Sequence, residues 1–272
     1  MIACKTPAEV QRMRLANALV ADILGELRTI VADGVTTREL DEIAEERVHA
    51  AGAVPAFKGY HGYPATLCTS INDEVVHGIP SGRQLRDGDV VSIDLGVVLE
   101  DYYGDAAVTV PVGAIDGSIG NLLRVTEESL HQAIDHARPG GRVSDLGHAV
   151  QQHVESHGYS VVREFVGHGI GRSLHEEPQV PNYGRPGRGP RLAVGMVLAI
   201  EPMVAMGNPD VRVLNDGWTA VTRDGSTAAH FEHTVAITDE GPMVLSRPLA
   251  ASSAAGKADS VAGAASPAVD GV

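Results

Sequence analysis

The sequence predicts an α/β (α+β) fold built from two similar halves. Four segments repeat apolar residues at helical spacing, and several apolar, β-branched runs have the length of strands. The same pattern of helices and strands occurs twice along the chain. A length of 272 residues allows one large domain or two ordinary ones, so length alone does not decide the organisation.

The first helix has a clear N-terminal signal. Thr6 is a capping residue, Pro7 suits the first helical position, and Glu9 completes a capping box. Apolar residues then recur at helical spacing until Asp33-Gly34 ends the helix. The same periodicity predicts three further helices, each closely followed by glycine, over residues 37–51, 121–137 and 145–157.

Two apolar runs indicate a β-hairpin over residues 90–99 and 106–112. If the turn is centred between Leu99 and Glu100, Asp94 and Asp105 lie directly opposite each other. Their Cβ atoms are then about 4.5–5.5 Å apart. Two aspartates this close repel each other unless cations lie between them, as in metal centres bridged by carboxylates. The alternative is that one aspartate caps a turn or faces solvent.

The second half of the chain repeats the first. The strand from Gly88 to Asp94 resembles the strand from Gly195 to Glu201, and each ends in a carboxylate. The runs that begin at Asp105 and Glu232 form a second such pair. Glycines and apolar residues of the second helix region recur 106 positions later: Gly34, Leu40, Ala44, Val48 and Gly52 match Gly140, Leu146, Val150, Val154 and Gly158.

We therefore expect one domain over residues 1–248 that contains an internal duplication, approximately 10–112 and 115–245. Residues 249–272 form an Ala-, Ser- and Gly-rich tail with almost no large apolar side chains. Such a segment buries too little surface to offset the entropy lost on ordering, so we expect it to be disordered.

The composition argues against several partners and locations. A formal net charge of -14 has the wrong sign for binding a phosphate backbone or an anionic membrane. The two cysteines, Cys4 and Cys68, are too few for a disulfide scaffold, and the N-terminal residues lack the apolar run of a signal peptide. We expect a cytoplasmic protein that binds neither membranes nor, stably, nucleic acid.

Two glutamates extend the set of candidate metal ligands. Glu201 ends the apolar run 196–200, where an unpaired charge costs several kcal/mol on burial, so Glu201 needs a partner. Glu232 lies beside His230 and His233, and each of these three residues is either a ligand or an ordinary surface group.

Three histidines are further candidates. His168 lies in Gly167-His-Gly-Ile-Gly171, where glycines let backbone and ligand approach closely. His175 and His77 are the other two, although a lone histidine more often has a structural role. Four carboxylates with few histidines suit Mn, Fe(II), Co or Zn better than a cysteine-rich structural zinc site does.

Long, ordered motifs across residues 6–245 resemble the methionine aminopeptidase family in its bacterial type I form. The motifs are Tyr60-His-Gly-Tyr-Pro64, Ser70-Ile-Asn72, His77-Gly-Ile-Pro80, Val91-Ser-Ile-Asp94, Gly104-Asp105, Gly167-His-Gly-Ile-Gly171, His175-Glu-Glu-Pro178, Glu201-Pro-Met203 and Phe231-Glu-His-Thr234. The resemblance implies the pita-bread fold, a pseudo-two-fold α/β domain with a curved antiparallel sheet. Helices cover one face of this sheet, and a dinuclear metal site lies on the other.

The resemblance also implies a set of metal ligands. It implies two divalent ions of Co, Mn, Fe(II) or Zn, both bridged by Asp105 and Glu232. Asp94 binds one ion, and His168 with Glu201 completes the ligands of the other.

The implied reaction removes the N-terminal (initiator) methionine from nascent proteins and peptides whose second residue is small. A metal-bridging water or hydroxide attacks the first peptide carbonyl, and Glu201 accepts and transfers the proton. His175 steadies the carbonyl oxygen, and His77 lies near the scissile amide nitrogen. The implied substrate pocket suits a thioether and consists of Phe57, Tyr60, Tyr63, Cys68, His77, Leu174, His175 and Trp218. Trp218 alone is equally consistent with plain core.

Three alternatives fit less well. Peptidases acting before proline usually carry a large separate N-terminal domain, which these 272 residues do not contain. Pita-bread binding proteins that have lost their metal typically also lack the ligands. Dinuclear phosphoesterases normally have more histidine ligands and a basic group for phosphate. The expected partners are nascent polypeptide N-termini, encountered at the ribosome, and we expect a monomer.

Overall fold

The first two helices begin at capping residues. In the computed structural model, which describes residues 2–249, α1 (Pro7–Ile30) follows Thr6, whose Oγ1 accepts a hydrogen bond from the backbone N of Glu9 at 3.3 Å. The Glu9 carboxylate in turn accepts a hydrogen bond from the backbone N of Thr6 at 2.9 Å. The predicted capping box is therefore confirmed. α2 (Thr37–Ala50) begins with the same arrangement, made by Thr36 and Glu39.

The two later helices begin earlier than the sequence predicts. α3 (Gly117–His136) starts four residues before Asn121, because Asp116 caps it and accepts a hydrogen bond from the backbone N of Ser118 at 2.7 Å. α4 (Val143–Ser156) starts two residues before Asp145. Both helices end close to the predicted boundaries.

The strands pair only in antiparallel fashion within residues 2–249. They form four sets: β1-β4-β2 with β5 on β4, β15-β14-β9-β7-β8, β13-β10-β6, and β11-β12-β3. Their bounds are β1 Val54–Pro55, β2 Leu67–Ile71, β3 Glu74–Val76, β4 Val90–Leu99, β5 Tyr102–Pro111, β6 Ser160–Val161, β7 Gly167–Gly169, β8 Glu176–Val180, β9 Val197–Ile200, β10 Met203–Ala205, β11 Val211–Val213, β12 Ala220–Thr222, β13 Ala228–His230, β14 His233–Thr238 and β15 Gly241–Val244.

β4 and β5 form the predicted hairpin, but its turn lies one residue later than predicted. Leu99 pairs with Tyr102, so the turn consists of Glu100 and Asp101. Both turn residues have positive φ, 49° and 67°. A two-residue type I′ hairpin turn requires this conformation, and it matches the twist of the strands.

This register corrects the predicted arrangement of the two aspartates. Asp94 pairs with Ala107 and Asp105 pairs with Gly96, so the prediction that they lie directly opposite each other is wrong. Moving the turn by one residue displaces the pairing by two residues, and side chains alternate faces with a period of two. Asp94 and Asp105 therefore remain on the same face of the hairpin.

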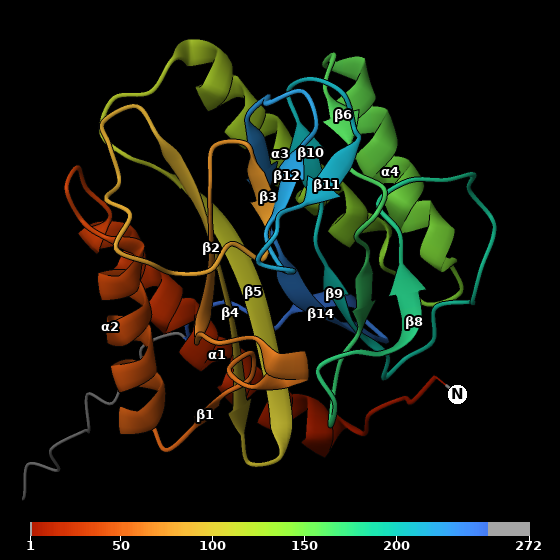
Figure 1. Cartoon of the computed structure of the whole chain (residues 1–272). Helices are drawn as coiled ribbons and strands as arrows, with labels where there is room; N and C mark the ends of the chain where they lie inside the picture. The colour runs from red at the N-terminus through yellow and green to blue at the C-terminus, as the bar shows by residue number, and fades with distance from the viewer. Residues whose placement is uncertain (1, 250–272) are drawn as a thin grey trace, which may run out of the picture.

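Side-chain alternation separates the core from the opposite face of the strands. Ile93 and Leu95 of β4 join the main apolar core, whereas Asp94 between them projects the other way. α1 packs against β4 and β5, while α3 packs against β9, β10 and β13. Figure 1 shows α1 and α2 beside β4 and β5, with α4 near β6 and β8. The face away from the helices carries the candidate ligands Asp94, Asp105, Glu201 and Glu232.

The two halves share local geometry at the repeated positions. α2 and α4 are both 14 residues long and begin 106 positions apart. Backbone N of Gly34 donates to the carbonyl of Leu85 at 2.9 Å, and backbone N of Gly140 donates to the carbonyl of Leu192 at 2.9 Å. Both glycines have φ near 88°, a conformation that side chains disfavour.

No helix within residues 2–249 is both long enough and apolar enough to cross a membrane. Apart from Leu249, the tail predicted over residues 249–272 lies outside the described residues.

Candidate metal centre and substrate cavity

One cavity of about 170 Å³ is lined by all the residues to which the sequence analysis gave a metal-binding, catalytic or substrate-binding role, but not by the open candidates His230 and His233. Its polar side is made by the four carboxylates and three histidines, and its other side is apolar and aromatic. The residues come from both halves of the chain, which the sheets bring together. The lining is Phe57, Tyr60, Tyr63, Cys68, His77, Asp94, Asp105, His168, Leu174, His175, Glu201, Trp218 and Glu232.

The metal-ligand cluster is densest around Asp105, His168 and Glu232. One ligand atom from each lies within 4.8 Å of the others, and all three side chains are buried. Asp94 and Glu201 border the same cavity and are partly exposed. Asp94 and Asp105 lie inside strands β4 and β5, so neither aspartate caps a turn.

Burial raises the pKa values of all four carboxylates. The pKa of Asp94 rises to about 7. The pKa values of Asp105, Glu201 and Glu232 rise well above their usual range, first through burial and then through repulsion by neighbouring carboxylates. Carboxylates in such a cluster cannot all be ionised unless a positive charge lies among them.

Three carboxylate oxygens of the cluster have no hydrogen-bond partner within residues 2–249. They are Oδ1 of Asp94, Oδ1 of Asp105 and Oε1 of Glu232. Buried polar atoms normally have partners, because leaving them unpaired costs free energy. A divalent cation would satisfy these oxygens, and a set of carboxylates with one imidazole suits Mn, Fe, Co and Zn. The residues present therefore fit a metal centre.

His168 is held where strands approach each other through glycines. A Cβ atom at Gly167 or Gly169 would overlap backbone carbonyls of the neighbouring strands β9 and β8. His168 Nδ1 lies 3.0 Å from the acceptor Gly169 O, so Nδ1 carries the proton and Nε2 is free as a ligand. Nε2 lies 3.5 Å from Glu201 Oε1 and 3.9 Å from Asp105 Oδ2. Burial lowers the pKa of His168 to about 4, which keeps the imidazole neutral.

Asp105 is positioned by the close approach of α1. A Cβ atom at Gly104 would lie 2.7 Å from backbone atoms of α1, so only glycine fits there. Asn17 Oδ1 accepts a hydrogen bond from the backbone N of Asp105 at 3.2 Å. Thr234 Oγ1 donates to the carbonyl of Asp105 at 2.8 Å, which ties it to the strand that follows Glu232.

The two histidines predicted to contact substrate, His77 and His175, both line the cavity. His175 Nδ1 shares a hydrogen bond with Tyr60 Oη at 2.8 Å, and its ring packs edge-on against His168 at 4.3 Å. His77 has φ of 62°, which is unusual for a residue with a side chain. Two bonds to the carbonyl of Gly78, from Tyr63 Oη at 2.9 Å and the backbone N of Thr69 at 2.8 Å, hold this bend.

The apolar wall is assembled from separate segments. Phe57 packs against β4, where a Cβ atom at Gly96 would lie 2.5 Å from its ring. Trp218 is half-buried and packs edge-on against Tyr63 with ring centroids 5.1 Å apart. Cys68 is buried beside them. Trp218 therefore borders the cavity and is not merely part of the core.

Comparison with known proteins identifies the family. Residues 11–239 match Metallopeptidase family M24. The chain is 53% identical over 247 residues to methionine aminopeptidase 1 of Bacillus subtilis (strain 168), covering 91% of this chain and 100% of that one. The chain belongs to metallopeptidase family M24, and within it to the methionine aminopeptidases.

Solved structures of methionine aminopeptidases have the same fold. The Thermotoga maritima enzyme superposes with a TM-score of 0.90 at 49% identity, covering 91% of this chain and 100% of that one. The Rickettsia prowazekii enzyme gives 0.89 at 40% identity, covering 90% and 100%. The predicted pita-bread fold is therefore confirmed. As an M24 metallopeptidase the chain binds divalent metal, and the Asp105, His168 and Glu232 cluster is its candidate centre.

Two buried side chains near the site, His230 and Asn182, have no role assigned by the sequence motifs. His230 is 2% exposed, and its Nε2 lies 3.7 Å from Glu201 Oε2. Asn182 is buried, and its Nδ2 donates to the carbonyl of Glu201 at 3.0 Å. His230 could be noticed only as a neighbour of Glu232, and nothing in the sequence around Asn182 indicates its contact. His233, the other neighbour, bonds to Ser246 Oγ at 2.8 Å and does not line the cavity.

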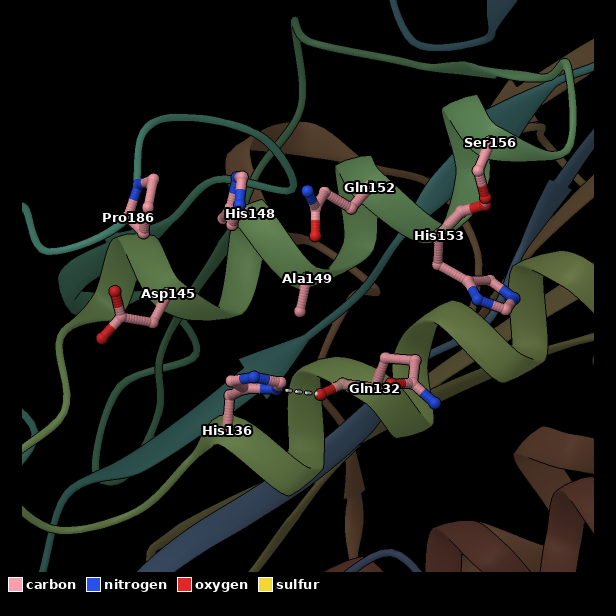
Figure 2. A pocket seen from close by; sticks show the side chains of 9 residues that line it. All are labelled: Gln132, His136, Asp145, His148, Ala149, Gln152, His153, Ser156 and Pro186. Carbon is pink, nitrogen blue, oxygen red and sulfur yellow. Dashed lines mark hydrogen bonds between the residues drawn. The ribbon is translucent and has the colours of Figure 1, made fainter.

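A larger hollow lies elsewhere. A groove of about 570 Å³ runs between α3 and α4 and is lined by His136, Asp145, His148 and His153 among others. Figure 2 shows these side chains spread along the two helices. They do not bring three ligand atoms within 4.8 Å of one another, unlike the predicted centre. Size alone therefore does not identify the functional site.

Proposed function

We propose that this chain removes N-terminal methionine from proteins and peptides whose second residue is small. The observation that carries the proposal is the cavity in which four carboxylates and three imidazoles meet an apolar pocket. An unbranched thioether side chain fits flat aromatic and apolar walls such as Phe57, Tyr63 and Trp218. The scissile bond then lies beside the ligand cluster.

The proposed centre holds two divalent ions of Co, Mn, Fe(II) or Zn. Asp94, Asp105, His168, Glu201 and Glu232 would hold them. The ions, when bound, supply an activated water and polarise the substrate carbonyl. The unpaired carboxylate oxygens and the neutral imidazole of His168 support this assignment.

Three side chains of the cavity have separate roles in the proposed reaction. Glu201 accepts the proton of the attacking water and transfers it to the leaving amine. His175, oriented by Tyr60, donates a hydrogen bond to the carbonyl oxygen, where negative charge develops. His77 lies at the scissile amide nitrogen.

Phosphate chemistry is disfavoured by the lining of the cavity. No lysine or arginine of residues 2–249 contributes to it, so a phosphate group would meet no cationic side chain. The proposed partners are nascent polypeptide N-termini, encountered in the cytoplasm at the ribosome by a monomer that binds no nucleic acid stably. We also propose that residues 1–248 form one domain that arose by duplication, which the matching helices α2 and α4 support.

The deciding experiment is methionine release from Met-Ala-Ser and from a matched Met-Lys peptide, with and without added Co or Mn. We expect metal-dependent release only from Met-Ala-Ser, and little from peptides with Leu or Pro second. Glu201→Ala should abolish turnover and leave the fold intact, whereas the exposed Glu240→Ala is the matched control. Equal release from both peptides would refute the proposed selectivity, and wild-type rates for Glu201→Ala would refute its role.

A further inference from the structure

A buried histidine outside the predicted site lies against Glu201. His230, the last residue of β13, is 2% exposed, and its Nε2 is 3.7 Å from Glu201 Oε2. The Nε2 atom has no hydrogen-bond partner within residues 2–249. A buried donor or acceptor left unpaired costs about 1–3 kcal/mol, so a residue held in this way requires an explanation.

The backbone of His230 is held from two sides. Its N donates to Thr109 Oγ1 at 2.9 Å, and Thr109 Oγ1 donates to its carbonyl at 2.8 Å. On the other side His230 pairs with Met203 of β10. Only side-chain torsions are therefore free to change the distance between the imidazole and Glu201.

The two oxygens of Glu201 face different imidazoles. Oε1 lies 3.5 Å from His168 Nε2, and Oε2 lies 3.7 Å from His230 Nε2. His168 already lies within the ligand cluster, so His230 is the group available to direct Oε2. A distance of 3.7 Å exceeds an ordinary N–H···O bond by about 0.5 Å, and such contacts often shorten when ligands bind.

We propose that His230 is a positioning residue whose Nε2–H donates to Glu201 Oε2 and so orients this carboxylate. The inference rests on the proposed function of Glu201. His230 does not line the cavity. Groups that orient a metal ligand typically contribute about 10- to 100-fold to metal affinity or activity.

The test compares H230M, which removes the donor but keeps the side-chain length, with H230Q, which keeps an N–H donor. We expect H230M to lower kcat for Met-Ala-Ser by about 10- to 100-fold with little change in KM. H230Q should stay within about threefold of the wild type, because its amide still donates. Thermal stability should not fall in H230M, since removing an unpaired buried polar atom relieves a cost.

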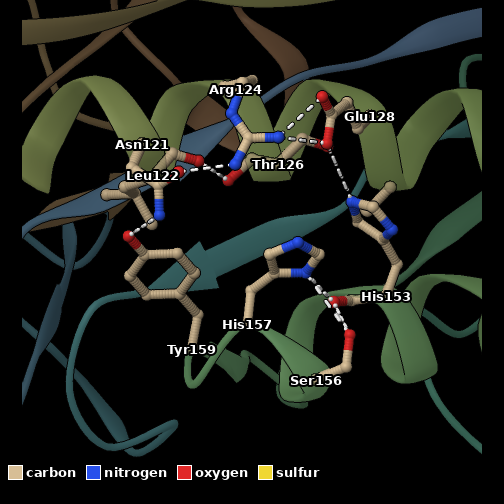
Figure 3. Close-up of polar contacts among 10 residues, drawn as sticks. Asn121, Leu122, Arg124, Thr126, Glu128, His153, Ser156, His157 and Tyr159 are labelled. Carbon is tan, nitrogen blue, oxygen red and sulfur yellow. Dashed lines mark hydrogen bonds and ion pairs between the residues drawn. The ribbon is translucent and has the colours of Figure 1, made fainter.

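A surface imidazole and carboxylate pair provides the matched control. His153 Nε2 on α4 lies 3.1 Å from Glu128 Oε2 on α3, next to Arg124, as Figure 3 shows. This pair lies outside the cavity. H153Q should therefore keep the wild-type kcat and KM.

A second readout does not depend on turnover. Calorimetric titration with Co(II) alone should show about tenfold weaker binding to H230M than to the wild type or H230Q. If the wild type releases no methionine, the proposed function fails, and this titration still tests His230. A folded H230M with wild-type kcat and Co(II) affinity would overturn the inference. If H230M does not fold, H230A replaces it, and equal rates for H230A and H230Q would overturn it.

Discussion

The strand pairs that carry the candidate ligands differ between the two halves of the molecule. In the first half β4 and β5 form an unbroken ladder, and Asp94 and Asp105 lie within it. In the second half β9 and β10 pair with β14 and β13 in one continuing register, from Ile200 opposite His233 to Met203 opposite His230. The ladder is interrupted between these pairs, at Glu201 and Glu232.

The interruption of the ladder at Glu201 and Glu232 allows a contact between the two halves. Pro202 has no backbone N–H, so the ladder cannot be regular beside Glu201. The backbone N of Glu232 instead donates to the carbonyl of Ala107 in β5, at 2.9 Å. In the first half a regular hairpin carries Asp94 and Asp105. In the second half the interrupted ladder bonds to β5, and this contact places Glu201 and Glu232 near the two aspartates.

The largest predicted effect tests whether the halves contribute equally to one centre. Asp105→Ala and Glu232→Ala should each lower kcat by about 1,000-fold and abolish tight binding of one metal equivalent, because several kcal/mol of charge stabilisation are lost. The measurements are peptide hydrolysis and calorimetric metal titration. Asp101→Asn, in the exposed turn of the same hairpin as Asp105, is the matched control. A much smaller loss for one half would contradict a shared centre.

Structural features that depend on short segments of the chain can be predicted from the sequence. The Thr6 capping box and the set of residues around the cavity could be predicted from the sequence, because caps and motifs are local patterns. The roles of those residues remain predictions. The hairpin register could not be predicted, because neither Glu100 nor Asp101 is the Asn or Gly that normally marks a type I′ turn. The sequence leaves open whether His230 is a ligand or a surface group, because its proximity to Glu201 results from strand pairing between distant segments.

The N-terminal segment contacts the second half of the chain through Lys5. Lys5 Nζ lies 2.6 Å from Glu176 Oε2, and both side chains are largely buried. The other oxygen of Glu176 accepts from the backbone N of Arg172 at 2.8 Å, which fixes the loop that carries Leu174 and His175. Lys5→Met should destabilise the fold by about 2–3 kcal/mol, because it leaves a buried carboxylate without its cation. It should also raise KM.

Thermal unfolding and peptide kinetics measure both effects. Lys58→Met is the matched control, since Lys58 is exposed and its pair with Glu45, also at 2.6 Å, contributes less than about 1 kcal/mol. Lys5→Arg should restore most of the stability. Equal thermal unfolding midpoints for Lys5→Met and Lys58→Met would show that the Lys5–Glu176 ion pair does not stabilise the fold.

The pKa values predict a dependence of stability on pH in metal-free protein. The carboxyls of the cluster have folded-state pKa values raised above those of the unfolded chain, to about 7 for Asp94, because of burial and repulsion by neighbouring carboxylates. They hold protons that the unfolded chain has released, so stability falls as pH rises from about 6.5 to about 7.5, the range in which folded Asp94 loses its proton. The buried histidines have lowered pKa values, so they oppose this trend only below about pH 7, where the unfolded chain protonates its histidines. With chelator the melting midpoint should drop by a few degrees across this range, and Mn(II) should flatten the trend. An unchanged slope with Mn(II) would place the metal elsewhere.

The smallest predicted effect concerns the hairpin turn that distinguishes the first half. Glu100 and Asp101 both hold positive φ, where side chains are strained by about 1 kcal/mol or more relative to glycine. The double substitution E100N/D101G supplies the residues that a type I′ turn favours and should raise the melting midpoint by about 2–4 °C. Hydrolysis rates should not change, because the turn is exposed and does not line the cavity. A fall in activity would instead mean that the register of β4 and β5, and with it the spacing of Asp94 and Asp105, depends on strain held in this turn.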